Sequence, residues 1–428
     1  MKRITRLLLI ICLLLTLVSC IYTNTPPKTS NTQEPVLSPS PTPNLSISPN
    51  PSQTPNIADE NQIARAKISS IGDIMSHYTQ ILDAFDANTG NYDYSNSLKY
   101  VKNYTKTSDL LVANLETVMT EGEYTGYPMF NSPFQLAQNL KDIGVDIVSM
   151  ANNHSFDRGF DGLVSTIKNV EKAGLDHLGT YLDPIKKEED RGVLYKEVNG
   201  IKLVFLNYTY GTNYIRIPEE KEFSINLLYQ DYMGASSVIN EEQILSDLEY
   251  AKSLEPDLII GLIHWGVEYV TYESDLQRKT ADFLFDNGID IIFGNHSHVL
   301  QPIDFQKAEN TNYDKDRFVS YSQGNFMSNI TRTHYTLTSN ILNLYIEKDF
   351  ESNITRITHY DYVPLYMLTP EWGGSRFYVL PVHDFIKQYE SGDYSLINQK
   401  IYNDLLRARD ICHEILGKEN DKRYALRK

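Results

Sequence analysis

Several polar side chains with the chemistry of metal ligands stand directly after short apolar runs. The most informative group is His296-Ser297-His298, which closely follows the apolar run 289–293 and separates two imidazoles by one residue. On an extended segment this spacing turns both rings to one side, whereas a loop can aim them differently. Taken singly, each such group has an ordinary explanation as a turn, a helix cap or a buried structural histidine.

The whole set of candidate ligands combines carboxylate, amide and imidazole groups. Its members are Asp73, Glu116, Asn153, His264, His296 and His298. Imidazole together with carboxylate suits Zn, Mn, Fe, Ni or Co better than Ca or Mg. The number of ligands indicates one or two divalent transition-metal ions, with Glu116 as a candidate bridge. Two such ions polarise a phosphoryl oxygen, and a non-ligating His154 beside them could protonate a leaving oxygen.

The elements that must position these residues alternate between strands and helices. Apolar, β-branched runs predict strands at 66–71, 109–115, 145–150, 201–208, 256–263, 289–293 and 317–321. Helices are predicted at 132–143, 240–251 and 275–287, and the first opens on a capping box formed by Ser132-Pro133-Phe134-Gln135. A strand pair at 337–363 and a helical segment at 382–417 follow. This alternation predicts an α/β fold, in which ligands bind beyond the carboxyl ends of the strands.

Composition and charge exclude several classes of protein. The chain has 428 residues, of which 41% are hydrophobic, so it can bury a sizeable core. Its 39 Lys plus Arg against 55 Asp plus Glu give a net charge of −16, which argues against a nucleic-acid partner. Three cysteines in a chain of this length argue against a disulfide scaffold.

The N-terminus has the pattern of a targeting segment. A basic start with Lys2, Arg3 and Arg6 precedes the apolar run 7–18, which is too short to span a bilayer comfortably. The run ends in Leu-Val-Ser-Cys, which resembles a bacterial lipobox with Cys20 as the lipidated residue. We therefore expect residues 1–20 to be a lipoprotein signal peptide and the mature protein to be extracytoplasmic, lipid-anchored to the bacterial cell membrane. The alternatives are a plain secretory signal or an uncleaved anchor.

The segment after the signal has the composition of a disordered tether. Nine of the 18 prolines lie between residues 21 and 58, and Ser, Thr and Asn fill most of the remainder, so we expect residues 21–60 to be disordered. Without residues 1–20 the chain has 36 Lys plus Arg against 55 Asp plus Glu, a net charge of −19. Cys412 then remains the one free thiol, which we expect to be a small buried apolar residue.

Six motifs, taken together and in order, resemble the bacterial capsule-synthesis family CapA, also called PgsA. These motifs are GDIM (72–75), ANLE (113–116), ANNHSFDRG (151–159), IHWGVEY (263–269), GNHSHVLQP (294–302) and SQGNF (322–326). The family is linked to poly-γ-glutamate and belongs to the calcineurin-like metallophosphoesterase superfamily. No single motif is specific, but the set spans most of the folded chain.

The resemblance implies a fold and a domain plan. The expected fold is a four-layer α-β-β-α sandwich of the metallophosphoesterase type. Residues 61–365 would form this domain, and residues 366–428 would be a helical C-terminal extension that packs on the core.

The resemblance also implies roles for individual residues. Asp73 and His298 would hold one metal, and Asn153, His264 and His296 the other. Glu116 would bridge the two metals. His154 would stand where the superfamily keeps its catalytic proton donor. Four further residues are expected as neighbours of the site, namely His77, Asn114, Arg158 and Asn325.

The sequence departs from the wider superfamily at two places. Met75 stands where active phosphoesterases carry the histidine of an Asp-x-His motif, and Asn114-Leu115-Glu116 replaces an Asp-containing turn. The first metal site would then be weak, empty or completed by another residue such as His77. His77 lies four residues after Asp73 and either faces the site or begins a helix.

Three functions are compatible with this pattern. The first is a protein that assists synthesis, export or anchoring of poly-γ-glutamate or a similar anionic capsule polymer, with membrane subunits of a synthesis complex as partners. The second is a metal-dependent hydrolase of phosphoester or polymer amide bonds at the cell surface. The third is a non-catalytic polymer-binding module. Metal content separates the third function from the other two.

Overall fold

The computed structural model describes residues 63–234, 238–310 and 314–425. The predicted signal peptide, the tether and Cys20 lie outside these residues. Among the helices of the described residues, none is long and apolar enough to cross a membrane.

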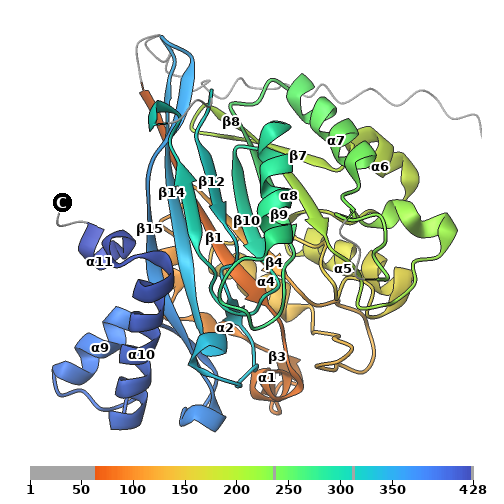
Figure 1. Cartoon of the computed structure of the whole chain (residues 1–428). Coiled ribbons are helices and arrows are strands. Elements are labelled where there is room, and N and C mark those ends of the chain that lie inside the picture. Colours follow the sequence, from red (N-terminus) through yellow and green to blue (C-terminus); the bar gives the residue numbers. More distant parts are fainter. Residues whose placement is uncertain (1–62, 235–237, 311–313, 426–428) are drawn as a thin grey trace, which may run out of the picture. The chain divides into compact units, whose positions relative to one another are not determined.

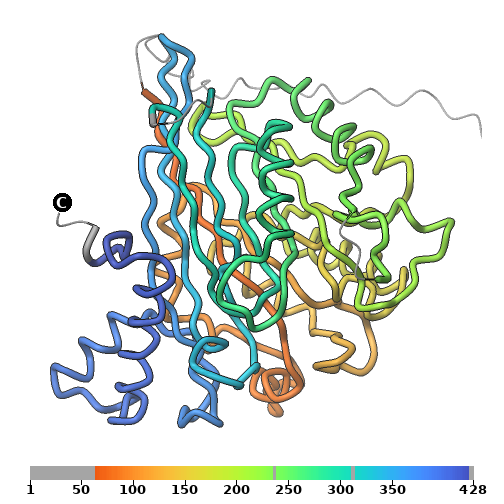
Figure 2. Tube along the Cα trace, viewed as in Figure 1, coloured from red at the N-terminus to blue at the C-terminus, as the bar shows by residue number. Residues whose placement is uncertain are grey.

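The first sheet combines parallel and antiparallel strands. Its order is β16 (Tyr378–Pro381), β15 (Ile354–Leu368), β14 (Thr338–Asp349), β1 (Ile63–Ile74), β4 (Leu110–Leu115), β5 (Ile147–Ser149) and β6 (Asp176–Leu178). Strands β1, β4, β5 and β6 are parallel to one another, and β14, β15 and β16 are antiparallel to their neighbours. The short β13 (Asn325–Met327) pairs with the end of β1 at Asp73 and Ile74. Figure 2 shows the long β14–β15 hairpin lying along β1.

The second sheet has six strands. Its order is β11 (Ile303–Gln306), β12 (Arg317–Ser320), β10 (Ile291–Asn295), β9 (Leu258–His264), β8 (Ile201–Thr209) and β7 (Val193–Val198). The four central strands β12, β10, β9 and β8 are parallel to one another, so their carboxyl ends lie at one edge of the sheet. A separate two-stranded sheet joins β2 (Phe85–Asp86) and β3 (Asn91–Tyr92).

The two sheets share a buried core. Ile68 of β1 and Val112 of β4 belong to the same hydrophobic cluster as Phe205, Ile260 and Phe293 of the second sheet. These positions alternate along their strands with residues that face the helices, as in a sheet covered on both faces. Burial of both faces explains why the strands have nearly continuous apolar sequences.

Helices cover the outer faces of both sheets (Figure 1). Helices α7 (Glu241–Ser253) and α8 (Asp275–Asp286) share a core with the outer side of β8, β9 and β10. Helices α4 (Gln135–Asp142), α5 (Gly159–Lys172), α9 (Val382–Glu390) and α10 (Gln399–Leu416) contribute to the core on the outer side of the first sheet. The remaining helices are α1 (Tyr78–Ala84), α2 (Ser95–Leu98), α3 (Lys102–Thr105), α6 (Pro184–Asp190) and α11 (Lys422–Ala425), with short 3-10 turns between elements. The predicted α/β architecture, with sheets flanked by helices, is confirmed.

One local prediction is wrong. The capping box expected at Ser132 does not form, because α4 begins at Gln135 and its N-cap, Phe134, has no side-chain cap. The hydroxyl of Ser132 instead lies 2.7 Å from that of Thr117. A tertiary contact has replaced the local cap. By contrast, Ser274 caps α8 through a complete capping box with Gln277.

The C-terminal segment takes part in the first sheet as well as in helices. Strand β15 continues past residue 366, where the predicted extension was to begin, and β16 adds another strand to the same sheet. Helix α10 then places Ile411 and Leu416 in the core that the two sheets share. Cys412 is a free cysteine that is fully buried there, and burial raises its pKa well above the ordinary value.

Candidate metal centre

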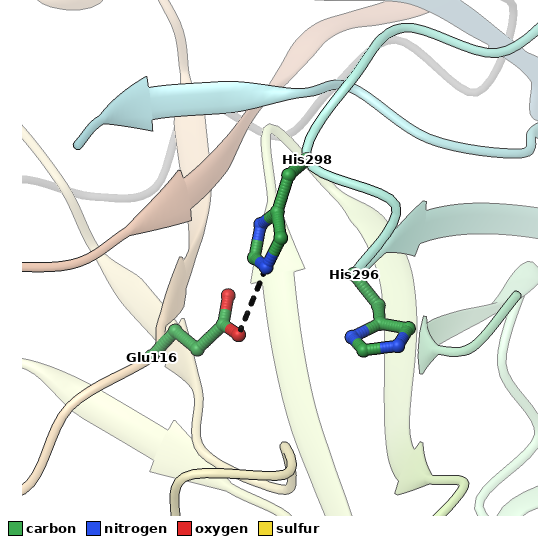
Figure 3. A group of neighbouring side chains, drawn as sticks. All are labelled: Glu116, His296 and His298. Carbon is green, nitrogen blue, oxygen red and sulfur yellow. Dashed lines mark ion pairs between the residues drawn. The ribbon is translucent and has the colours of Figure 1, made fainter. Parts of the chain in front are cut away.

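The predicted ligands converge although they come from several strand ends. Asp73 lies near the end of β1, Glu116 directly follows β4, and His264 ends β9. His296 and His298 follow β10, and Figure 3 shows both rings beside the Glu116 carboxylate. All five side chains are buried. The parallel strands of both sheets therefore deliver their polar ends to one buried place.

Two overlapping groups of side chains have the spacing of a metal site. The first is Glu116 with His296 and His298, and the second is Asp73 with Glu116 and His264; within each group the ligand atoms lie within 4.8 Å of one another. Glu116 Oε1 is 3.6 Å from His264 Nε2 and 4.0 Å from His298 Nε2. Glu116 belongs to both groups, as expected of a residue that stands between two ions.

The Asp73 carboxylate is held in place by Asn114 of β4 and by His298 of the loop after β10. Its Oδ1 accepts a hydrogen bond from Asn114 Nδ2 at 2.8 Å, and its Oδ2 lies 3.1 Å from His298 Nδ1. Asn325 Oδ1 also lies 3.1 Å from that ring nitrogen. The amide of Asn325 donates to the His298 carbonyl, which fixes the backbone of the loop. Asn114 and Asn325 are therefore close partners of the candidate ligands.

Asn153 contacts the opposite side of the cluster. Its Oδ1 lies 2.8 Å from His264 Nε2, and its amide nitrogen donates to Asn213 Oδ1 at 3.0 Å. An amide makes a metal ligand only when its oxygen is fixed, and the hydrogen bond to Asn213 supplies that orientation. Asn114 Nδ2 lies 3.3 Å from the other ring nitrogen, His264 Nδ1.

The two histidines of the His-x-His motif belong to a loop. Strand β10 ends at Asn295, and both His296 (φ 101°) and His298 (φ 58°) have positive φ values. Residues with side chains seldom adopt this conformation, and it is found preferentially at functional sites. The bend places the two ring centroids 5.8 Å apart and brings both rings to Glu116. Of the two alternatives considered for this motif, an extended segment and a loop, the structure shows the loop.

Three buried atoms of the cluster have no hydrogen-bond partner among the described residues. They are both carboxylate oxygens of Glu116 and Nδ1 of His296. Burying a carboxylate without donors is costly, and a cation between the oxygens and the imidazoles would compensate that cost. The donor set of carboxylate, amide and imidazole is also the set that divalent transition metals prefer. These residues therefore fit a metal ion.

The electrostatics of the cluster agree with this fit. Burial, followed by the charges of Asp73 and Glu268, raises the pKa of Glu116 well above its ordinary value. Burial and the neighbouring imidazoles lower the pKa of His264 and of His296 well below 6.5. Both rings are therefore neutral at pH 7, which is the form that binds metals.

His154 lies beside the cluster but is bound to other groups. Its Nδ1 lies 2.8 Å from Asp157 Oδ2, and its ring contacts Phe130 edge-on at 4.7 Å between centroids. The same Asp157 oxygen accepts a hydrogen bond from the Phe130 backbone nitrogen at 2.7 Å. A carboxylate at Nδ1 fixes the ring tautomer, as in enzymes that use histidine for proton transfer. The catalytic role of His154 stays a prediction.

The other two predicted neighbours, His77 and Arg158, form hydrogen bonds with groups outside the cluster. Nδ1 of His77 accepts a hydrogen bond from the Asn329 backbone nitrogen at 3.1 Å, and burial lowers the pKa of His77 to about 4. His77 also precedes α1, so it begins a helix, one of the two alternatives considered for it. Arg158 donates from Nη2 to Thr125 Oγ1 at 2.5 Å, which directs it to the 125–131 loop.

Several residues at the site carry no recognisable sequence motif. Tyr210 follows β8, and its ring lies 4.5 Å from that of His296. Asn213 binds Asn153 and also lies 3.3 Å from His154 Nε2. Both lie in the loop that follows β8, for which the sequence analysis gave no candidate residue. Asp157, three residues after His154, stood inside a quoted motif and could have been found there.

The fold and the site together define an α/β protein with a buried cluster of carboxylate and histidine side chains at the strand ends. The model of the family described as bacterial capsule synthesis protein PGA_cap matches residues 67–330. The chain therefore belongs to this family, as its motifs predicted, and the match contains every predicted site residue except Cys20.

Named relatives agree with the family. The chain is 27% identical over 271 residues to the "Capsule biosynthesis protein CapA" of Bacillus anthracis. This alignment covers 61% of this chain and 59% of that protein. It is 28% identical over 237 residues to the "PGA biosynthesis protein CapA" of Bacillus subtilis, covering 54% of this chain and 56% of that protein. The chain thus spans somewhat more than half the length of these relatives.

A solved structure is also similar. A "novel phosphatase" from Mycoplasma pneumoniae superposes with a TM-score of 0.40 at 16% identity, covering 72% of this chain and 96% of that one. Similarity at this level says nothing about activity.

Proposed function

We propose that this protein assists the synthesis, export or anchoring of poly-γ-glutamate or a similar anionic capsule polymer, using a metal centre of one or two ions. Family membership supports the link to capsule polymer. The observation that carries the metal centre is the buried Glu116 carboxylate, which lacks hydrogen-bond donors and faces three histidines. Mn, Zn and Fe are the metals that suit this donor set.

The residues divide the chemistry between them. Asp73, Glu116, Asn153, His264, His296 and His298 would hold the ions. A bound ion would polarise an oxygen of the polymer or of an activated precursor. His154, oriented by Asp157, would deliver or accept a proton at its Nε2.

We propose further that Cys20 carries a lipid and holds the protein at the outer face of the bacterial cell membrane, where membrane subunits of a synthesis complex would be its partners. The lipobox-like sequence before Cys20 supports this proposal. Metabolic labelling with a fatty acid is expected to mark the wild-type chain and not Cys20→Ala. Labelling of both, or of neither, would contradict lipidation at this residue.

A metal-dependent hydrolase is the second candidate, and the His154–Asp157 pair favours it because a carboxylate orients the ring of a histidine that transfers protons. His154→Ala separates the two candidates. Polymer amount would be measured in cells, and hydrolysis of a phosphodiester and of poly-γ-glutamate would be measured with the purified full-length chain.

The assembly function predicts that His154→Ala retains metal and loses polymer, while the wild-type chain hydrolyses neither compound. Turnover by the wild-type chain that disappears in His154→Ala would establish the hydrolase instead. Normal polymer in cells carrying His154→Ala would contradict the role given to this residue.

A further inference from the structure

An exposed arginine stacks on an aromatic ring that adjoins one of the candidate metal ligands. The guanidinium carbon of Arg332 stands 4.0 Å from the centroid of the Tyr269 ring. Arg332 is exposed, and no carboxylate of the described residues lies within ion-pair distance of it. A guanidinium that lies flat on an aromatic ring keeps its N–H donors at the ring edge, where they can bind an anion.

The ring under Arg332 is fixed by the candidate metal site. The Tyr269 ring centroid lies 5.8 Å from that of His298, and the Tyr269 backbone nitrogen donates to the Ser297 carbonyl at 2.7 Å. Tyr269 has a φ of 66°, so the loop holds it in a conformation that residues other than glycine rarely adopt. The loop after β9 is thus attached to the loop that bears the two histidines.

The loop that carries Arg332 is fixed as well. It follows β13, and the backbone nitrogen of Asn329 donates to His77 Nδ1 at 3.1 Å. Further along the loop, the Trp372 indole donates to the Thr331 carbonyl at 3.4 Å. The loop is thereby held on both sides of Ile330. These contacts give His77 a structural purpose that does not require it to bind metal.

The charge around the cluster makes such a cation useful. The chain is acidic overall, and Asp73 and Glu116 are buried at the centre of the site. Glu268, next to Tyr269, is exposed and its charge reaches Glu116. An anionic substrate would be repelled by this surface unless a cation offset the repulsion. A guanidinium provides a planar fork that binds a carboxylate through two parallel hydrogen bonds.

We propose that Arg332 is the substrate-binding residue of this site and binds a carboxylate of an anionic polymer, with Tyr269 as its positioning residue. The inference rests on the proposed function, which names poly-γ-glutamate as the polymer class. The Tyr269 ring contacts both Arg332 and the His298 ring, so a polymer bound by Arg332 would reach the metal ligands across this ring.

The test measures the affinity of the full-length, metal-loaded chain for poly-γ-glutamate oligomers by calorimetry at two salt concentrations. Arg332→Ala is expected to weaken binding about tenfold, the loss expected when one charge-assisted interaction is removed, and to flatten its salt dependence. Arg332→Lys keeps the charge but loses the fork, so its affinity should fall between the two. Arg356→Ala is the matched control, because Arg356 is an exposed arginine near the start of β15.

A second pair of variants tests Tyr269. Tyr269→Phe retains the ring and is expected to bind as the wild type does, whereas Tyr269→Leu is expected to weaken binding. Metal content, measured for every variant, is expected to be unchanged. A loss of metal in Arg332→Ala would overturn a role confined to substrate binding.

The remaining outcomes separate the inference from the function on which it rests. If the wild type binds poly-γ-glutamate and Arg332→Ala binds it equally, the assignment of Arg332 fails while the proposed function stands. If the wild type binds none, both fail. Inorganic phosphate, titrated in parallel, tests whether Arg332 binds a phosphate group in place of a carboxylate. If Arg332→Ala loses affinity for phosphate but not for poly-γ-glutamate, the carboxylate assignment is overturned.

Discussion

Replacement of Glu116 by Gln tests the metal centre through stability. In the metal-free protein the Glu116 carboxylate is buried, has no hydrogen-bond donor among the described residues and has a pKa well above its ordinary value, first because of burial. The folded state therefore prefers the protonated form. Below the unfolded pKa of about 4.3, Glu116 is protonated in both states and its burial costs little. As pH rises from there through the raised folded pKa, the unfolded state ionises more readily than the folded state, so the protein loses stability. Glu116→Gln removes this loss, so metal-free Glu116→Gln should be at least as stable as metal-free wild type at pH 7.

Metal reverses the order of the two proteins. An ion present at 100 times its Kd stabilises a folded protein by about 2.7 kcal/mol. For a chain of this size that corresponds to a rise in Tm of roughly 3–6 °C. If Glu116→Gln weakens binding about 100-fold, the same concentration equals the Kd of the variant and provides only about 0.4 kcal/mol. We therefore expect a metal-dependent gain in the wild type that is nearly absent in the variant.

The assay is thermal unfolding of the wild type, Glu116→Gln and the control Glu249→Gln, each with chelator and with added Mn²⁺ or Zn²⁺. Glu249 is exposed on α7, so Glu249→Gln makes the same chemical change away from the cluster. An equal metal-dependent gain in all three proteins would refute the placement of Glu116 at the metal. So would a wild type whose Tm is insensitive to either ion.

Two further substitutions have defined outcomes. Asp157→Asn is expected to retain metal but to lower any proton-transfer activity by 10² or more, because the His154 ring loses the carboxylate that orients it; turnover equal to the wild type would contradict this role. Asp421→Asn is expected to cost about 2 kcal/mol at pH 7. Burial alone would raise the pKa of Asp421, but hydrogen bonds from His383 and His413, at 2.6 and 2.8 Å, lower it to about 2. This depressed pKa provides stability above the unfolded value near 4, so urea unfolding should show the two proteins converging as pH falls from 4 to 2. A gap that stays constant over that range would contradict the assignment.

The strand ends were predictable from sequence because the parallel strands are uniformly apolar. β4, β9 and β10 are buried along their whole length, so the first polar residue after each run marks the edge of the sheet. This pattern located Glu116 and His264 without knowledge of the strand order. The order itself was not predicted, because it depends on long-range pairing that no local period encodes.

The residues that sequence reasoning missed lie in loops. Arg332 contacts Tyr269 from a loop 63 positions further along the chain; Tyr269 stood at the end of the motif IHWGVEY, but the motif did not indicate this contact. Asn213 likewise acts through contacts with Asn153 and His154 that only the fold creates. The capping box at Ser132 failed for the same reason, since the contact with Thr117 comes from a distant part of the chain.

The most direct measurement of the metal centre is anomalous diffraction from crystals of the full-length chain grown with Mn²⁺ or Zn²⁺. The proposed centre predicts a peak bounded by Glu116, Asn153, His264 and His296, with ligand distances of about 2.0–2.3 Å. A peak elsewhere, or fully ordered side chains at the cluster with no anomalous signal, would contradict it.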